Sequence, residues 1–145
     1  MKITPLLFIA SILALPVFAA EPPPSDVKFV DHATVEHAFT TGQPLLVNSR
    51  YKVQTGRRVK PGEVEFHEHD ADIFYVLEGT ATFVTGGTIE GSRITGPGET
   101  RGKEIKGGAT HHLTKGDVIV VPPGVPHWFT EVGGTFLYFV VKVTQ

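Results

Sequence analysis

The sequence predicts an all-β protein built as a single sandwich or barrel, and three observations favour this class. From Leu45 onward, short runs rich in β-branched and aromatic residues alternate between apolar and polar positions with a period of two. Gly and Pro turns such as PG, EG, KG and PPG separate these runs. Residues 31–40 are the one good helix candidate, and the chain shows no internal repeat. We therefore expect one barrel and not two.

The strand pattern is interrupted once, by a glycine-rich segment. The expected strands occupy residues 45–47, 51–54, 64–67, 73–77, 80–85, 118–121, 127–132 and 136–143. Between them, residues 86–108 contain eight glycines among 23 residues and mixed charges. We expect a long hairpin excursion there with weak strands at 88–89 and 104–105. A long loop in a compact domain is either a lid or binding element, or a variable surface loop, and the sequence leaves both open.

Residues 1–19 have the order of an export signal. A basic Lys2 precedes the apolar stretch PLLFIASILAL, and small or aliphatic residues follow at 17–19. This stretch is shorter than the roughly 20 residues of a membrane-spanning helix. We therefore expect residues 1–19 to be removed, and the protein to be periplasmic or secreted with no membrane association afterwards. Residues 20–44 are then a proline-rich linker and an N-terminal arm, and residues 45–145 are the barrel domain.

Composition narrows the classes of partner. The formal net charge is −2 at pH 7, and acidic residues are scattered along the chain, so no basic face for nucleic acid is indicated. The chain has no cysteine, which excludes disulfides and leaves packing and a bound metal as sources of stability. The C-terminal run at 136–143 is apolar on both faces, so it is central or covered, and a homodimer is compatible with it.

Histidines gather in two segments that suit metal binding. In the first, Glu65, His67 and His69 alternate along a strand, so their side chains share one face. In the second, the turn Pro122-Pro123-Gly124 fixes the backbone just before His127. Metal ligands benefit from such rigidity because they must be held closely in place.

These segments resemble the two motifs of the cupin superfamily, G(X)5HXH(X)3-4E(X)6G and G(X)5PXG(X)2H(X)3N. The first motif is matched by His67, His69 and Gly79, with Asp72 in place of the glutamate and with Gly62, its opening glycine, one residue closer to His67 than the pattern has it. The second is matched closely, with Glu131 where the family has asparagine; its matching positions are Gly116, Pro122, Gly124 and His127. The resemblance spans residues 51–143 and implies a double-stranded β-helix, or jelly-roll, with the short helical arm before it.

The resemblance also implies one divalent transition metal, namely Fe, Mn, Ni, Zn or Cu, held by His67, His69, Asp72 and His127. Asp72 follows His69 after two residues, where the family leaves three or four, so Asp70 or a water molecule competes for the fourth position. Glu65 lies on the same face and is a candidate general base or a support for the ligands.

A metal with open coordination positions predicts chemistry on a small oxygenated organic substrate, either dioxygenase-like or isomerase- or lyase-like. The alternative is a non-catalytic cupin that binds a small molecule or uses the metal to stabilise the barrel. A fold alone does not separate these functions. An open cavity beside the metal favours the enzyme, whereas a barrel filled by Phe74, Phe83 or Phe129 favours the alternative.

Overall fold

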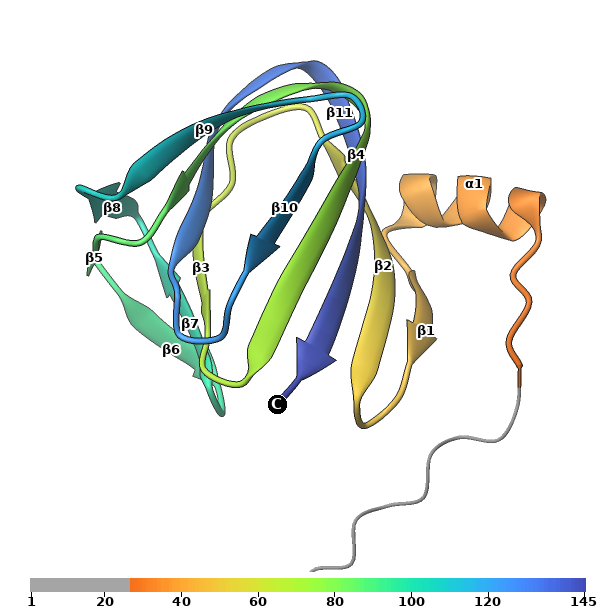
Figure 1. Ribbon diagram of the computed structural model, residues 1–145, viewed down its shortest axis with the longest axis horizontal. Helices are drawn as coiled ribbons and strands as arrows, with labels where there is room; N and C mark the ends of the chain where they lie inside the picture. Colours follow the sequence, from red (N-terminus) through yellow and green to blue (C-terminus); the bar gives the residue numbers. More distant parts are fainter. Residues whose placement is uncertain (1–26) are drawn as a thin grey trace, which may run out of the picture.

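The computed structural model describes residues 27–145, so the predicted signal at 1–19 and the proline-rich linker lie outside the described residues. Figure 1 shows one short helix beside a curved β-structure. The elements are α1 (His32–Thr41), β1 (Pro44–Val47), β2 (Tyr51–Arg58), β3 (Val64–His67), β4 (Asp70–Thr85), β5 (Thr88–Glu90), β6 (Arg93–Gly96), β7 (Glu99–Gly102), β8 (Glu104–Lys106), β9 (Ala109–Thr114), β10 (Val118–Val121) and β11 (His127–Thr144). Within residues 27–145, no helix is long and apolar enough to cross a membrane.

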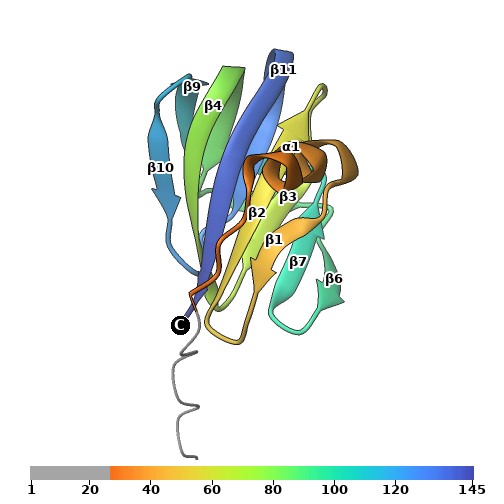
Figure 2. The same ribbon diagram turned by 90° about the vertical axis from the view of Figure 1, so that its right-hand side faces the viewer.

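Two long antiparallel strands, β4 and β11, organise the barrel. β11 pairs with β2, β3 and β4, while β4 also pairs with β9 and β10. Figures 1 and 2 show the resulting two walls, with β9 and β10 on one side and β2, β3, β7 and β6 on the other. This arrangement confirms the predicted all-β jelly-roll barrel.

The barrel interior is filled by an aromatic core. Alternate residues of β4 and β11 point inward, as a strand period of two requires. Phe83 and Phe129 lie at its centre, with ring centroids 4.4 Å apart. The buried cluster comprises Phe74, Val76, Ala81, Phe83, Leu113, Val121, Phe129, Phe136, Tyr138 and Val140. Within residues 27–145, the buried polar side chains are those of His67, Asp72 and His127.

The predicted helical arm is confirmed, and the structure shows a cap at each end of α1. The side chain of Asp31 accepts a hydrogen bond of 2.9 Å from the Thr34 amide, which satisfies a free donor at the helix start. Gly42 ends the helix in the left-handed region at φ 70°, and its N–H donates to the carbonyl of Ala38. Phe39 packs on Phe139 of β11 with ring centroids 5.6 Å apart, so the arm covers part of the outer sheet.

Several strand boundaries differ from those expected. The runs at 73–77 and 80–85 join into β4, and those at 127–132 and 136–143 join into β11 with local register shifts. Gly79 allows the runs at 73–77 and 80–85 to continue as one strand. Its φ of 79° suits glycine, and its Cα lies so close to the carbonyl of Thr135 that a side chain would not fit. β6, β7 and β9 were missed, since their polar residues lack apolar alternation.

Replacing Gly79 by alanine should destabilise the protein by about 2 kcal/mol, because the substitution adds backbone strain and a clash with the Thr135 carbonyl. Urea unfolding measures the loss. Gly134→Ala is the matched control, since Gly134 has a similar φ of 72° but open space at its Cα. Equal losses in the two variants would show that the close approach contributes nothing.

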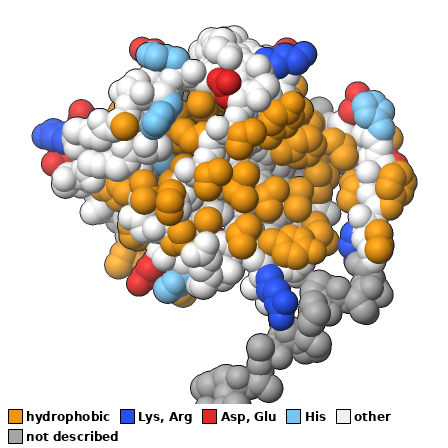
Figure 3. Space-filling model, in the orientation of Figure 1, with side chains coloured by type: hydrophobic (Ala, Val, Ile, Leu, Met, Phe, Trp, Pro, Cys, Tyr) orange, Lys and Arg blue, Asp and Glu red, His pale blue; other side chains and the backbone are white. Residues whose placement is uncertain are grey.

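Figure 3 shows apolar side chains gathered on the face seen in Figure 1. Four members come from neighbouring strands: Ile73 and Tyr75 of β4 pair with Val120 and Val118 of β10. Their exposed fractions range from 37% for Ile73 to 61% for Val118. Tyr75, which is 46% exposed, therefore lies on the outer face of the barrel.

Candidate metal centre

Four potential ligands converge at the polar end of the barrel. Glu65 and His67 come from β3, Asp72 from β4 and His127 from β11. An oxygen of Asp72 lies 3.5 Å from Nε2 of His67 and 3.5 Å from Nε2 of His127. A carboxylate oxygen of Glu65 lies 3.5 Å from Nε2 of His67. The ligand atoms of Glu65, His67 and His127 all lie within 4.8 Å of one another, a spacing that one ion can bridge.

The imidazole rings of His67 and His127 are each oriented by an oxygen atom that contacts Nδ1. The carbonyl of Val125 lies 3.2 Å from Nδ1 of His127, and because a carbonyl can only accept, this contact places the proton on Nδ1. Nδ1 of His67 lies 2.8 Å from a carboxylate oxygen of Glu99. Such contacts orient a histidine ring and direct its Nε2 lone pair toward a metal.

Nε2 of His127 is buried and has no hydrogen-bond partner within residues 27–145. A buried polar atom normally has one, so this nitrogen is suited to a ligand. Two imidazoles and two carboxylates form a donor set that first-row divalent metals accept. The residues present therefore fit a transition metal ion.

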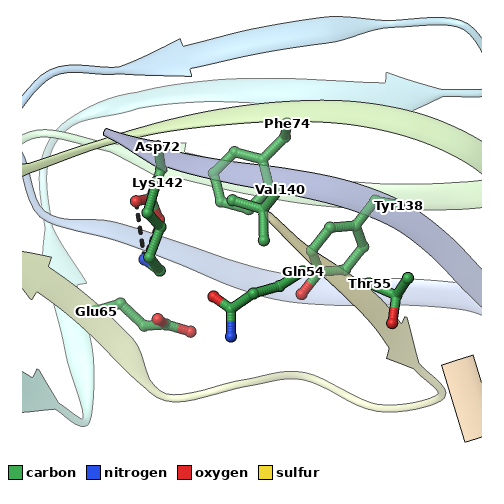
Figure 4. Close-up of a pocket in the computed structure, with 8 residues that line it drawn as sticks. All are labelled: Gln54, Thr55, Glu65, Asp72, Phe74, Tyr138, Val140 and Lys142. Carbon is green, nitrogen blue, oxygen red and sulfur yellow. Dashed lines mark hydrogen bonds and ion pairs between the residues drawn. The ribbon is translucent and has the colours of Figure 1, made fainter. Parts of the chain in front are cut away.

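Lys142 also enters the cluster, and sequence reasoning missed it. Its Nζ lies 2.8 Å from Nε2 of His67. It also lies 2.6 and 2.8 Å from the two oxygens of Asp72, a contact that Figure 4 shows. The strand pattern contained the signal, because Tyr138, Val140 and Lys142 alternate along β11 and the first two face the core. A lysine at the inward phase of an apolar strand predicts a buried partner.

The glycine-rich segment contributes to the site through β7. In the register of β3 and β7, His67 faces Glu99 and Glu65 faces Arg101. A guanidinium nitrogen of Arg101 lies 3.5 Å from Glu65, and Arg58 donates to Glu65 at 3.2 Å. The expected weak strands at 88–89 and 104–105 are present as the β5–β8 pair. Of the two interpretations of residues 86–108, the structure supports a segment that takes part in the site.

The surroundings keep both carboxyl groups ionised. Burial alone raises the pKa of Glu65, but the hydrogen bond with His67 and the positive charge of Arg101 outweigh it and lower the pKa to about 2. Burial likewise raises the pKa of Asp72, and contacts with His127 and Lys142 bring it below its usual value. The site therefore presents two negative charges at neutral pH, which favours a divalent cation.

The pKa of His67 is shifted upward. Burial lowers it, but the hydrogen bond with Glu65 and the charges of Asp72 and Glu99 raise it by more than burial and Lys142 lower it. Lys142 donates toward Nε2 of the same ring. A proton on that nitrogen and the Lys142 contact therefore exclude each other.

These shifts predict an acid-sensitive fold for the metal-free protein. The carboxyl pKa values of Glu65 and Asp72 are lower in the folded state than in the unfolded chain. Both groups thus stabilise the fold above about pH 4.5, and this contribution is lost as the pH falls toward 2. Urea unfolding from pH 7 to pH 3 should show Glu65→Gln losing less stability than the unaltered protein. Parallel curves would contradict the assignment.

His69 is the expected ligand that the structure does not bring to the cluster. β3 ends at His67, and the chain then turns, so the strand alternation does not extend to residue 69. The His69 side chain is 63% exposed and lies near Gly98 at the rim. The expected common face of Glu65, His67 and His69 is correct for the first two and wrong for the third.

The spacing of the first motif explains this difference. When Glu65 and His67 take the two HXH positions, four residues separate His67 from Asp72 and six separate Asp72 from Gly79. Both intervals then fit the family pattern, and Asp72 falls at the position where the family has its glutamate. The two-residue interval after His69 was the signal that the frame began too late.

The other candidates lie elsewhere. Asp70 accepts a hydrogen bond of 2.7 Å from Thr144, away from the cluster, so it does not compete with Asp72. Glu131, at the asparagine position of the second motif, accepts from Thr82 at 2.9 Å on the surface. The Pro-Pro-Gly turn has the expected positioning role, because Gly124 donates its N–H to the carbonyl of His67.

A pocket of about 170 Å³ adjoins the cluster (Figure 4). At about 30 Å³ per water molecule, it holds roughly five or six waters. Figure 4 shows the carboxylate of Glu65 and the amide of Gln54 directed into this space. Its lining combines polar and apolar side chains: Gln54, Thr55, Glu65, Asp72, Phe74, Tyr138, Val140 and Lys142.

The family model described as Cupin matches residues 31–145, which is most of the chain. The chain belongs to the cupin family. No curated protein sequence matches this cupin.

Solved structures have a similar fold. A Bacillus halodurans protein, BH2720, is 13% identical with a TM-score of 0.59, over 83% of this chain and 84% of that chain. The Thermus thermophilus protein TT1209 is 18% identical with a TM-score of 0.52, over 72% of this chain and 82% of that one. The Cnp3 cupin domain of Schizosaccharomyces pombe is 15% identical with a TM-score of 0.53, over 72% of this cupin and 60% of that chain, less than two thirds of its length. At these identities, the likenesses show the fold alone.

Proposed function

We propose that this cupin binds one divalent transition metal ion through Glu65, His67, Asp72 and His127, and acts on a small oxygenated organic molecule in the adjoining pocket. The observation that carries the proposal is the buried Nε2 of His127, which has no hydrogen-bond partner in the described part of the chain and whose ring is anchored by the Val125 carbonyl. An oriented imidazole with a free lone pair beside two carboxylates is suited to a metal.

When bound, the metal would supply Lewis acidity or, if it is redox-active, electron transfer to the substrate. The protein's own groups supply the geometry around it. Arg58 and Arg101 hold Glu65, and Glu99 holds the ring of His67. Such supporting contacts fix the ligand atoms before the substrate arrives.

The pocket supports a small polar substrate. Gln54 offers both a donor and an acceptor, while Phe74 and Val140 form an apolar wall. Phe74, Phe83 and Phe129 fill the barrel, as expected for the non-catalytic alternative, but the pocket beside the cluster leaves space for a compact molecule. A larger molecule has no room to extend inward. We infer a compact substrate whose oxygens face the metal and Gln54, and whose carbon atoms contact Phe74.

Metal content tests the proposal directly. The protein should be purified without a metal-binding tag, analysed for its elements, stripped with a chelator, and titrated with Fe²⁺, Mn²⁺, Ni²⁺, Zn²⁺ and Cu²⁺. We expect one site per chain and a rise in melting temperature with the cognate metal, because a ligand that binds the folded state stabilises it. If all five metals leave the melting temperature unchanged and none binds, the proposal is wrong.

We also propose export, on the strength of residues 1–19. Expression of the full chain in a bacterium with an inner and an outer membrane should yield a shortened protein in the periplasmic fraction or the medium, detected by intact-mass measurement. A full-length product retained in the cytoplasm would overturn this part of the proposal.

A further inference from the structure

The ammonium group of Lys142 holds the central position of the candidate metal centre. Its three short contacts are with Nε2 of His67 and with both oxygens of Asp72, at 2.6 to 2.8 Å. A lysine ammonium has three N–H donors, so these three acceptors can engage all of them. His67 and Asp72 are two of the four side chains assigned to the metal. Lys142 therefore uses the same atoms that a metal ion would use.

The position of Lys142 follows from the sheet and not from a chance side-chain conformation. Lys142 lies directly opposite Asp72 in the register of β4 and β11, and directly opposite Lys52 in that of β2 and β11. Directly opposite residues in an antiparallel pair project on the same face, with Cβ atoms about 5 Å apart. The Lys142 side chain is 14% exposed and the Asp72 side chain 2%, so their contact is shielded from water.

A shielded carboxylate needs a positive partner, because an uncompensated buried charge is strongly destabilising. Lys142 provides that partner within the chain itself. A divalent ion binding to Asp72 and His67 would meet an ammonium group already hydrogen-bonded to both. The Nε2 atom of His67 has a single lone pair, which cannot serve the metal and the ammonium group together, so the ammonium must leave this nitrogen.

We propose that Lys142 is the resident cation of the metal-free protein and competes with the metal for Asp72 and His67. This inference rests on the proposed metal function and adds a constraint to it. Metal binding requires Nζ to withdraw from Nε2 of His67, and the space into which it can move is the adjoining pocket that Lys142 lines. Lys142 thus weakens metal affinity while it stabilises the metal-free barrel.

The test compares Lys142→Met with the matched control Lys52→Met. Lys52 lies beside Lys142 on the neighbouring strand, but its ion pair is with Asp70 at 3.9 Å, outside the cluster. Metal-free Lys142→Met should melt about 5 °C or more below the unaltered protein. In calorimetry, Lys142→Met should bind Mn²⁺ or Zn²⁺ at least about tenfold more tightly than the unaltered protein does. The reason is that the metal no longer has to displace hydrogen bonds made by a charged donor. Lys52→Met should match the unaltered protein in both measurements.

The outcomes separate the inference from the function on which it rests. If the unaltered protein and Lys142→Met bind metal with equal affinity, the competition is wrong and the metal function stands. If no variant binds metal, the proposed function is wrong. The melting temperature of the metal-free protein then tests whether Lys142 is the resident cation. A lower melting temperature in Lys142→Met supports this role, and an unchanged one overturns it. Should Lys142→Met fail to fold, Lys142→Gln removes the charge but keeps an amide donor for Asp72, and the same affinity comparison applies.

Discussion

Substituting His127 by alanine should reduce transition-metal affinity by a factor of about 100 or more, whereas the same substitution at His69 should leave it unchanged. Loss of one ligand or its support commonly costs at least 10- to 100-fold in affinity. His127 is buried, and its Nε2 faces Asp72 at 3.5 Å. His69 is 63% exposed at the rim. Calorimetric titration of the chelator-stripped variants with Zn²⁺ or Mn²⁺ measures the difference.

This pair of variants also tests the frame of the first motif. The frame that begins at His67 makes His69 a ligand, and the frame that begins at Glu65 does not. A large loss of affinity in His69→Ala, with little change in Glu65→Gln, would favour the first frame and contradict the structure. Circular dichroism of each variant controls for folding, because His127 also contacts the aromatic core through Phe74 and Phe83.

The largest effect on stability is expected from Phe83→Ala. Phe83 is fully buried and packs against Phe74, Phe129 and His127, with ring centroids 5.5, 4.4 and 5.7 Å away. Removing its ring should cost about 3–5 kcal/mol of unfolding free energy, from lost burial and the cavity left behind. The variant should also bind metal less tightly, because the ring that supports His127 is gone.

Urea unfolding followed by tryptophan fluorescence measures the loss, since Trp128 adjoins the core and donates to the Gly62 carbonyl at 2.8 Å. Phe29→Ala is the matched control: the same substitution at a residue that is 88% exposed should change stability by less than about 0.5 kcal/mol. A Phe83→Ala loss as small as that of the control would show that the interior rearranges to fill the cavity.

The barrel could be predicted because its signals are local. Alternating hydrophobicity and Gly or Pro turns located β2, β3, β10 and both halves of β4 and β11, and the helix candidate at residues 31–40 matches α1. β9 carries two histidines and three threonines or alanines in its six residues, so its sequence has no apolar alternation to detect. Its place is set by pairing with β4, which is a long-range property.

Prediction of the candidate site was less complete, for a different reason. His67, Asp72 and His127 follow from motif spacing, and Glu65 from alternation. Alternation does not show where a strand ends. For this reason, His69 was wrongly predicted to share a face with Glu65 and His67. Glu99 and Arg101 reach the site through the pairing of β7 with β3, which no motif records. Lys142 lies 70 residues from Asp72 along the chain, and only the register of β4 and β11 brings them together.

Through Glu99, β7 would allow the electron donation by His67 to change while the proposed metal ligands stay the same. Glu99 contacts the outer nitrogen of His67 and none of the other proposed ligands. A carboxylate at that nitrogen makes the imidazole a stronger electron donor, so exchanging Glu99 for a neutral residue changes the electron density at a metal without altering the inner coordination shell. On the proposed function, the glycine-rich segment of this cupin is therefore a place where substitutions would alter reactivity while leaving the proposed ligands unchanged.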